Sequence, residues 1–176
     1  MKLYIDSSVL VKLYYPEPES KQFSEWIIKQ KQPILFTQFH ELEMVNAFAL
    51  KVFRKEILKE SFNAFHRIIK KDKAAGILEF VNPDWSEVLQ EAIKISKRNS
   101  SVIGTRSLGI IHIASADILN CDTFLTNDNR QLSAALAIGL KTISINDLFT
   151  FLQNSPLAGI DLDISRSKDF PREIDL

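Results

Sequence analysis

Short apolar runs alternate along this chain with longer segments in which apolar residues recur at helical spacing. Short, continuously apolar runs are typical of strands in a parallel sheet that is buried on both faces. The alternation therefore predicts an α/β fold, with a mainly parallel central sheet flanked by helices on both faces. The predicted strands are Lys2–Ile5, Ile34–Phe36, Leu78–Val81, Thr123–Thr126 and Lys141–Ser144.

The segments between the strands carry the periodicity and the boundary residues of helices. After the Pro-Asp start signal that ends at Asp84, for example, Trp85, Val88 and Ala92 recur near the helical period. The predicted helices are 7–15, 18–30, 38–53, 56–73, 84–97, 107–120, 130–138 and 146–153.

No repeat or linker divides the chain, so we expect one domain over residues 1–154. Residues 155–176 alternate small apolar and charged residues without helical period, and form a separate tail. We expect this tail to be ordered by contact with the domain surface or with a partner chain.

The composition limits the partners and the cellular compartment that fit this chain. The formal net charge is zero, from 22 basic and 22 acidic residues, so the chain lacks the basic excess that nucleic-acid binders often carry. The single cysteine, Cys121, excludes an intramolecular disulfide and fits a reducing cytoplasm. We expect no signal peptide, because Asp6 interrupts the first apolar run. We expect no membrane span, because no apolar run approaches the roughly 20 residues that a spanning helix needs.

Two acidic residues follow predicted strands: Asp6 comes after Lys2–Ile5, and Asp128 after Thr123–Thr126. In an open parallel sheet, ligands bind beyond the carboxyl ends of the strands. Each acid could simply cap the helix that follows it, because Asp is a preferred N-cap residue. Two acids at one edge also suit a divalent cation, because Mg²⁺ and Mn²⁺ prefer carboxylate and water ligands.

Four segments resemble, in order, the motifs of VapC-type toxins, which are PIN-domain nucleases of bacterial toxin–antitoxin pairs. The segments are YIDSSVLVKLYYPEPES, LEMVNAFAL, SLGIIHIASA and DTFLTNDNR, which together extend the resemblance over about residues 1 to 150. The resemblance implies a metal-dependent endoribonuclease that hydrolyses RNA phosphodiesters with Mg²⁺ or Mn²⁺. It also implies a cognate antitoxin as partner, an RNA substrate and a homodimer.

By the same resemblance, Asp6, Glu43 and Asp128 are the first, second and fourth acids of the catalytic metal site. Glu41 is a rival for the second position, but residues 41 and 43 lie about 200° apart on a helix, so only one can face the site. The third acid should lie three residues before His112, where this chain has Gly109. We expect the three remaining acids to converge on one pocket, with the Gly109 Cα facing it.

Gly109 puts the activity of this site in doubt. Asp117, the nearest acid along the same helix, lies about 12 Å further along the axis and cannot substitute. Two interpretations stay open. The protein is a VapC-type ribonuclease weakened or inactivated by the glycine, with its metal bound weakly or lost, or it is a catalytically degenerate PIN-fold protein that binds an antitoxin or RNA.

Other candidate residues have structural explanations. His112 lies between two isoleucines, which favours a structural histidine over a general base. Ser7, Thr126 and Asn127 adjoin the acids and can orient carboxylates or cap helices. The stretch Lys51–Lys73 holds eight basic and three acidic residues, which suits RNA phosphates but is more typical of a solvated helix face.

Three other strand-end chemistries fit less well. A response-regulator receiver needs paired acids after its first strand, where Asp6 is followed by two serines. A phosphatase of the haloacid dehalogenase type needs Asp-x-Asp there, and position 8 is serine. A dinucleotide-binding domain needs a glycine-rich turn at this place, which is absent.

Overall fold

The computed structural model describes residues 2–15, 20–30 and 32–144, and twelve helices and strands lie within these ranges. They are β1 (Leu3–Ile5), α1 (Ser7–Tyr14), α2 (Ser20–Lys29), β2 (Ile34–Phe36), α3 (Gln38–Phe53), α4 (Lys59–Ala74), β3 (Leu78–Phe80), α5 (Trp85–Ile103), α6 (Ser107–Ile118), β4 (Thr123–Thr126), α7 (Asn129–Ala137) and β5 (Lys141–Ser144). The predicted helix 146–153 and the predicted ordering of the tail 155–176 lie outside the described residues.

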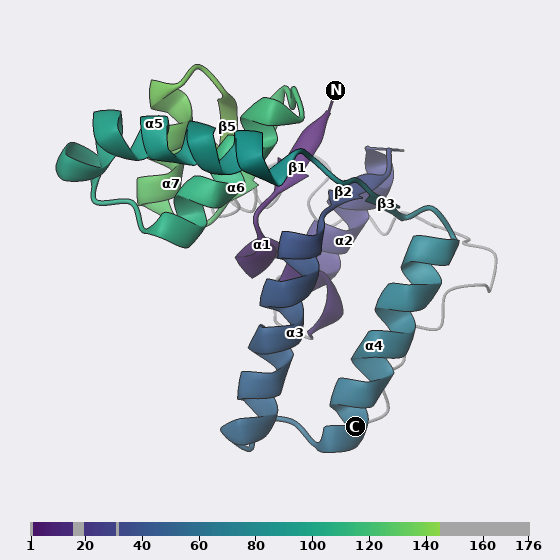
Figure 1. Cartoon of the computed structure of the whole chain (residues 1–176). Helices are drawn as coiled ribbons and strands as arrows, with labels where there is room; N and C mark the ends of the chain where they lie inside the picture. Colours follow the sequence, from purple (N-terminus) through teal and green to yellow (C-terminus); the bar gives the residue numbers. More distant parts are fainter. Residues whose placement is uncertain (1, 16–19, 31, 145–176) are drawn as a thin grey trace.

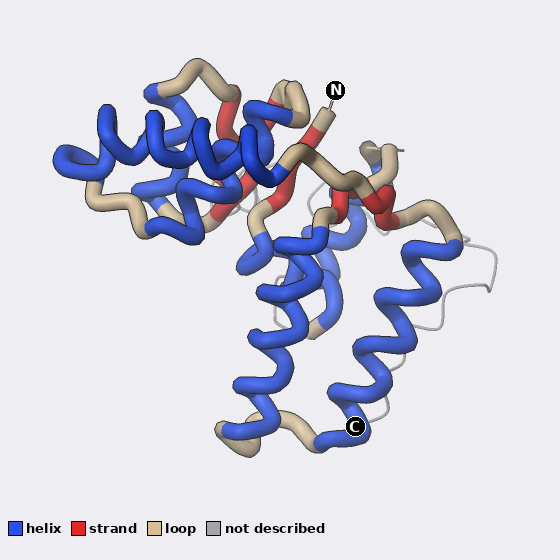
Figure 2. Tube along the Cα trace, viewed as in Figure 1, coloured by secondary structure: helices blue, strands red, loops and turns tan. Residues whose placement is uncertain are grey.

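All strand pairs are parallel, as the apolar runs predict. One sheet has the order β1-β4-β5 and the other pairs β2 with β3. The strands lie near the centre of the molecule with helices around them (Figure 2). The predicted single sheet is thus divided in two, although β1 and β2 lie next to each other.

Alternating strand residues point into two different cores. Tyr4 and Phe124 pack with the core formed with α5, α6 and α7. Their neighbours Ile5 and Leu125 pack with the core formed with α1 to α4. Because successive side chains of a strand point to opposite faces, these two cores cover both faces of the strands, which confirms the predicted architecture.

Helices α3 and α4 lie alongside each other and run away from the strands (Figure 1). The rings of Phe48 and Phe65 stack with their centroids 3.8 Å apart and join the two helices. The hydroxyl of Tyr14 donates to the buried carboxylate of Asp72 at 2.9 Å, which attaches α4 to α1. In the part of the chain that the structure describes, no helix is both long and apolar enough to cross a membrane.

Two helix boundaries differ by three residues or more from the sequence-based expectation. Helix α5 continues to Ile103 instead of ending near Lys97, because its end is set by Gly104, whose φ of 73° lies in the left-handed region that glycine favours. Helix α4 begins at Lys59, because the chain turns through Lys55 with φ 61° before it.

Candidate functional site

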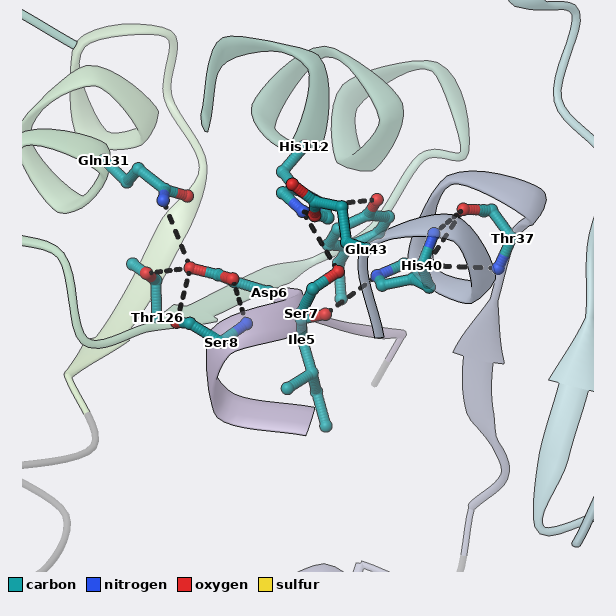
Figure 3. A network of polar contacts seen from close by, with 11 residues as sticks. Ile5, Asp6, Ser7, Ser8, Thr37, His40, Glu43, His112, Thr126 and Gln131 are labelled. Atoms are coloured by element: carbon teal, nitrogen blue, oxygen red, sulfur yellow. Dashed lines mark hydrogen bonds and ion pairs between the residues drawn. The ribbon is translucent and has the colours of Figure 1, made fainter. Parts of the chain in front are cut away.

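Asp6 lies at the carboxyl end of β1, where its backbone N–H continues the ladder to the Leu125 carbonyl at 2.9 Å. Its side chain is 3% exposed and caps α1: Oδ1 accepts from the Ser8 N–H at 2.6 Å. Oδ2 accepts from three side chains, the Thr126 hydroxyl (2.6 Å), the Ser8 hydroxyl (3.1 Å) and the Gln131 amide (3.1 Å). Protein donors therefore engage both carboxylate oxygens (Figure 3).

Asp128 lies at the end of the neighbouring strand and is exposed. Its Oδ1 accepts from the N–H groups of Arg130 (2.8 Å) and Gln131 (3.2 Å), so Asp128 is the N-cap of α7. Its own N–H donates to the Thr126 hydroxyl oxygen at 3.1 Å. Thr126 thereby links the two strand-end acids. Its hydroxyl donates to the carboxylate of Asp6, and its hydroxyl oxygen accepts from the backbone N–H of Asp128.

Glu43 lies on α3 and its carboxylate pairs with Nε2 of His112, on α6. Nδ1 of His112 contacts the hydroxyl of Tyr4 at 3.0 Å, and Ser7 Oγ lies 3.2 Å from Nε2. Burial raises the pKa of Glu43, but the hydrogen bond and charge of His112, together with a hydrogen bond from Ser7, outweigh it and hold the pKa below its usual value. The carboxylate of Glu43 is thus ionised and already paired.

The neighbourhood of Ser7 and His112 does not form a nucleophilic triad. In such a triad, the serine and the carboxylate contact opposite nitrogens of the imidazole. Here Ser7 and Glu43 approach the same nitrogen, Nε2, and the other nitrogen faces Tyr4. His112 is only 2% exposed. Its burial and its contacts support a structural role over that of a general base, as the sequence favours.

His40 fixes the start of α3 against the end of β1. Its Nε2 lies 2.9 Å from the Ile5 carbonyl, which can only accept, so Nε2 carries the proton. Its Nδ1 accepts from the Thr37 N–H at 3.1 Å. Burial, and then the nearby His112, lower the pKa of His40 well below its usual value. This neutral histidine positions α3, and with it Glu43, relative to Asp6.

Gly109 is buried on α6 and its Cα faces the side chain of Gln131. A Cβ at position 109 would lie 2.9 Å from Cγ and 3.0 Å from Cδ of Gln131. The space that a third acid would need is therefore partly filled by an amide side chain, which in turn donates to Asp6.

The residues predicted from the sequence thus fall into two connected groups. Asp6 and Asp128 share Thr126 and residue 131 as partners, whereas Glu43 is held by His112 beside Ser7. Among the described residues, no group of three or more His, Cys, Asp or Glu side chains could hold a metal ion.

A divalent cation does not fit this donor set as it is arranged. Oδ2 of Asp6 accepts three hydrogen bonds, Glu43 is paired with an imidazole, and position 109 offers no ligand atom. An amide N–H, which repels a cation, points at the carboxylate that would have to bind it.

Sequence reasoning missed Tyr4, His40 and Gln131. Tyr4 lies in a predicted strand and His40 in a predicted helix, and nothing in the sequence gives their partners. Gln131 lies three residues after Asp128, in the first turn of the predicted helix, where a polar residue is usually solvated. Its position relative to Gly109 depends on how α6 and α7 pack.

The depressed pKa of Glu43 predicts a loss of stability in acid. A carboxyl whose folded pKa lies below its unfolded value of about 4.5 contributes stability above that pH, and loses it as the pH falls through the folded pKa. We expect Glu43→Gln to be less stable than the wild type at pH 7 and to have a flatter stability profile below about pH 4.5. Urea denaturation at a series of pH values measures this, and identical profiles would contradict the pairing with His112.

Comparison with known proteins agrees with this architecture. The model of the PIN domain family matches residues 3–137. Among solved structures, the chain is similar to FitAcB from Neisseria gonorrhoeae, with a TM-score of 0.57, 16% identity, and coverage of 81% of this chain and 96% of that one. This likeness supports the fold. No curated protein matches the sequence. The chain belongs to the PIN domain family.

Proposed function

We propose that this chain is a VapC-type PIN-domain protein whose catalytic centre is degenerate, and that it acts by binding a cognate antitoxin, and RNA, with little or no hydrolysis. The observation that carries the proposal is the state of Asp6. This acid, the first of the family's cluster, is satisfied by four protein donors.

The arrangement of the other acids supports the same proposal. Glu43 is hydrogen-bonded to His112, and the carboxylate of Asp128 caps α7. In a metal-dependent nuclease, carboxylates at these positions face one another and repel until a cation binds between them. Here each acid has a hydrogen-bond partner within the protein, so no cation is needed between the carboxylates to satisfy them.

The resemblance of the four motifs to those of VapC-type toxins supports an antitoxin as partner. The homodimer proposed for the chain has the same basis, whereas the proposed cytoplasmic location rests on the single cysteine, Cys121. Helix α4 supports the binding of RNA, because its basic side chains can contact phosphates. The exposed basic residues of this helix include Lys59, Arg67, Lys70 and Lys71.

A second candidate is a weakened endoribonuclease that still hydrolyses RNA with Mg²⁺ or Mn²⁺. The specific observation in its favour is that Asp6 and Glu43 occupy the family's motif positions and that His112 and Ser7 hold Glu43 close to the end of β1. In this case Gln131 would have to give up its hydrogen bond before a cation could bind.

Cleavage of RNA separates the two candidates. We expect the wild-type protein, free of antitoxin, to cleave a labelled RNA hairpin no faster than Asp128→Asn with either Mg²⁺ or Mn²⁺. Asn is also a preferred N-cap, so this control keeps α7 folded. Metal-dependent cleavage that the wild type shows and Asp128→Asn lacks would overturn the proposal and favour the weakened nuclease.

The binding function needs its own measurement. We expect co-expression with the small reading frame adjacent to the gene to give a complex that elutes as one species in gel filtration, and the free protein to bind the hairpin in fluorescence anisotropy. Absence of both interactions would leave the degenerate site without a function and contradict the proposal.

A further inference from the structure

We propose that Gln131 occupies the place of the missing third acid and is the neutral partner of Asp6, so that the residue at 131 decides whether this centre takes up a divalent cation. The inference rests on the proposed function, because it explains how a degenerate site stays closed. It concerns a positioning residue and not a catalytic one.

The first step concerns the glycine. Gly109 has ordinary helical backbone, without the positive φ that would by itself favour glycine. What favours glycine here is the neighbour: a Cβ would meet Cγ, Cδ and Nε2 of Gln131 at 2.9, 3.0 and 3.2 Å. Real Cβ contacts are rarely so short, so Gly109 and Gln131 form a complementary pair in which the side chain of one fills the space left by the other.

The second step concerns the amide. Nε2 of Gln131 donates to Oδ2 of Asp6 at 3.1 Å, and this orientation follows from the chemistry of Asp6, because a carboxylate oxygen would repel the amide oxygen. The oxygen Oε1 is left buried with no hydrogen-bond partner in the described part of the chain. The amide thus meets Asp6 through its nitrogen, and its oxygen has no partner among the described residues.

The third step concerns how Gln131 is held. Its backbone N–H is bonded to Asp128 Oδ1 at 3.2 Å in the first turn of α7. The side chain therefore starts from a fixed point between Asp128 and Gly109 and reaches to Asp6. A carboxylate at position 131, having the same length and shape as the amide, would place an oxygen where Nε2 now lies, with no clash at position 109.

Gln131→Glu is the decisive variant for this reason. It puts two carboxylates within about 3 Å of each other, which is unfavourable unless a proton or a cation lies between them. We expect the metal-free variant to melt at a lower temperature than the wild type, and Mn²⁺ to raise its melting temperature again. We expect it to bind Mn²⁺ roughly tenfold or more tightly than the wild type, because carboxylate count sets the affinity of such sites.

Two control variants isolate the cause. Gln131→Leu keeps the bulk over Gly109 and removes the hydrogen bond, so it should bind Mn²⁺ as weakly as the wild type. Gln131→Met serves the same purpose if the leucine variant does not fold. Gln90→Glu adds a carboxylate on the exposed face of α5 and controls for charge alone.

Mn²⁺ binding is measured by electron paramagnetic resonance of the free ion, together with melting curves with and without Mn²⁺. The proposal is overturned if Gln131→Glu binds Mn²⁺ no more tightly than Gln131→Leu or Gln90→Glu, or if the wild type already binds it as tightly as Gln131→Glu. No RNA enters this measurement. Cleavage by the wild type would contradict the proposed function, whereas these binding results judge the role of Gln131 alone.

Discussion

The double variant Gly109→Asp/Gln131→Ala is expected to cleave RNA about 10²-fold faster than the wild-type protein in the presence of Mn²⁺. The change at 109 returns the third acid of the family's cluster, and the change at 131 removes the side chain that fills its place and donates to Asp6. Single-turnover cleavage of one labelled RNA by antitoxin-free protein measures the effect.

The single variant Gly109→Asp should gain less, because its side chain must first displace Gln131. Gln131→Ala alone should gain nothing, because it adds no ligand. The triple variant that also carries Asp128→Asn controls for contaminating nuclease. Equal cleavage by the double variant and the wild type would show that position 109 is not a catalytic position, and the alignment of the third motif would then be wrong.

Asp6→Ala is expected to lower the free energy of unfolding by about 3 kcal/mol or more at pH 7. The variant removes the N-cap of α1 and leaves the Thr126 hydroxyl and the Gln131 amide without their acceptor in a buried place. Hydrogen bonds to a charged group contribute more than neutral ones, and an unsatisfied buried donor has a cost of its own. Urea denaturation followed by circular dichroism measures the change.

The sign of this change is informative. In a cluster of mutually repelling acids, removing one acid stabilises the metal-free fold. In the arrangement seen here, it destabilises the fold, because Asp6 is held by donors. Asp128→Ala is the matched control: it removes an exposed N-cap, which has a typical cost of only about 1 kcal/mol. An Asp6→Ala variant as stable as the wild type would refute the view that Asp6 is satisfied by the protein.

The sequence predicts the frame of this protein well, because the frame depends on periodic patterns. The apolar runs locate the five strands found in residues 2–144 as far as the structure describes them, and the strand-end positions of Asp6 and Asp128 follow directly from these runs. The capping interpretation, one of the two left open for these acids, describes their contacts in the structure. The metal-site assignment of Asp6, Glu43 and Asp128 stays a prediction.

The contacts between side chains of the site could not be predicted from the sequence pattern. Glu43 and His112 lie on helices far apart in the sequence, and only the tertiary fold brings their side chains together. The contact between Gly109 and Gln131 likewise arises from the packing of α6 and α7. The division of the strands into two sheets also lies outside what the hydrophobic pattern encodes, because that pattern does not say which strands pair.

The junction between those two sheets has a consequence of its own. The strand ladders do not join β1 to β2, and at their carboxyl ends the imidazole of His40 spans the gap, from Thr37 after β2 to Ile5 in β1. A protonated imidazole has no lone pair with which to accept from the Thr37 N–H, so protonation would undo this joint. Because burial holds the pKa of His40 well below its usual value, the joint stays closed in weak acid. The spacing between the end of β1 and the start of α3 is thus unaffected by the mild acidification that would protonate an ordinary exposed histidine.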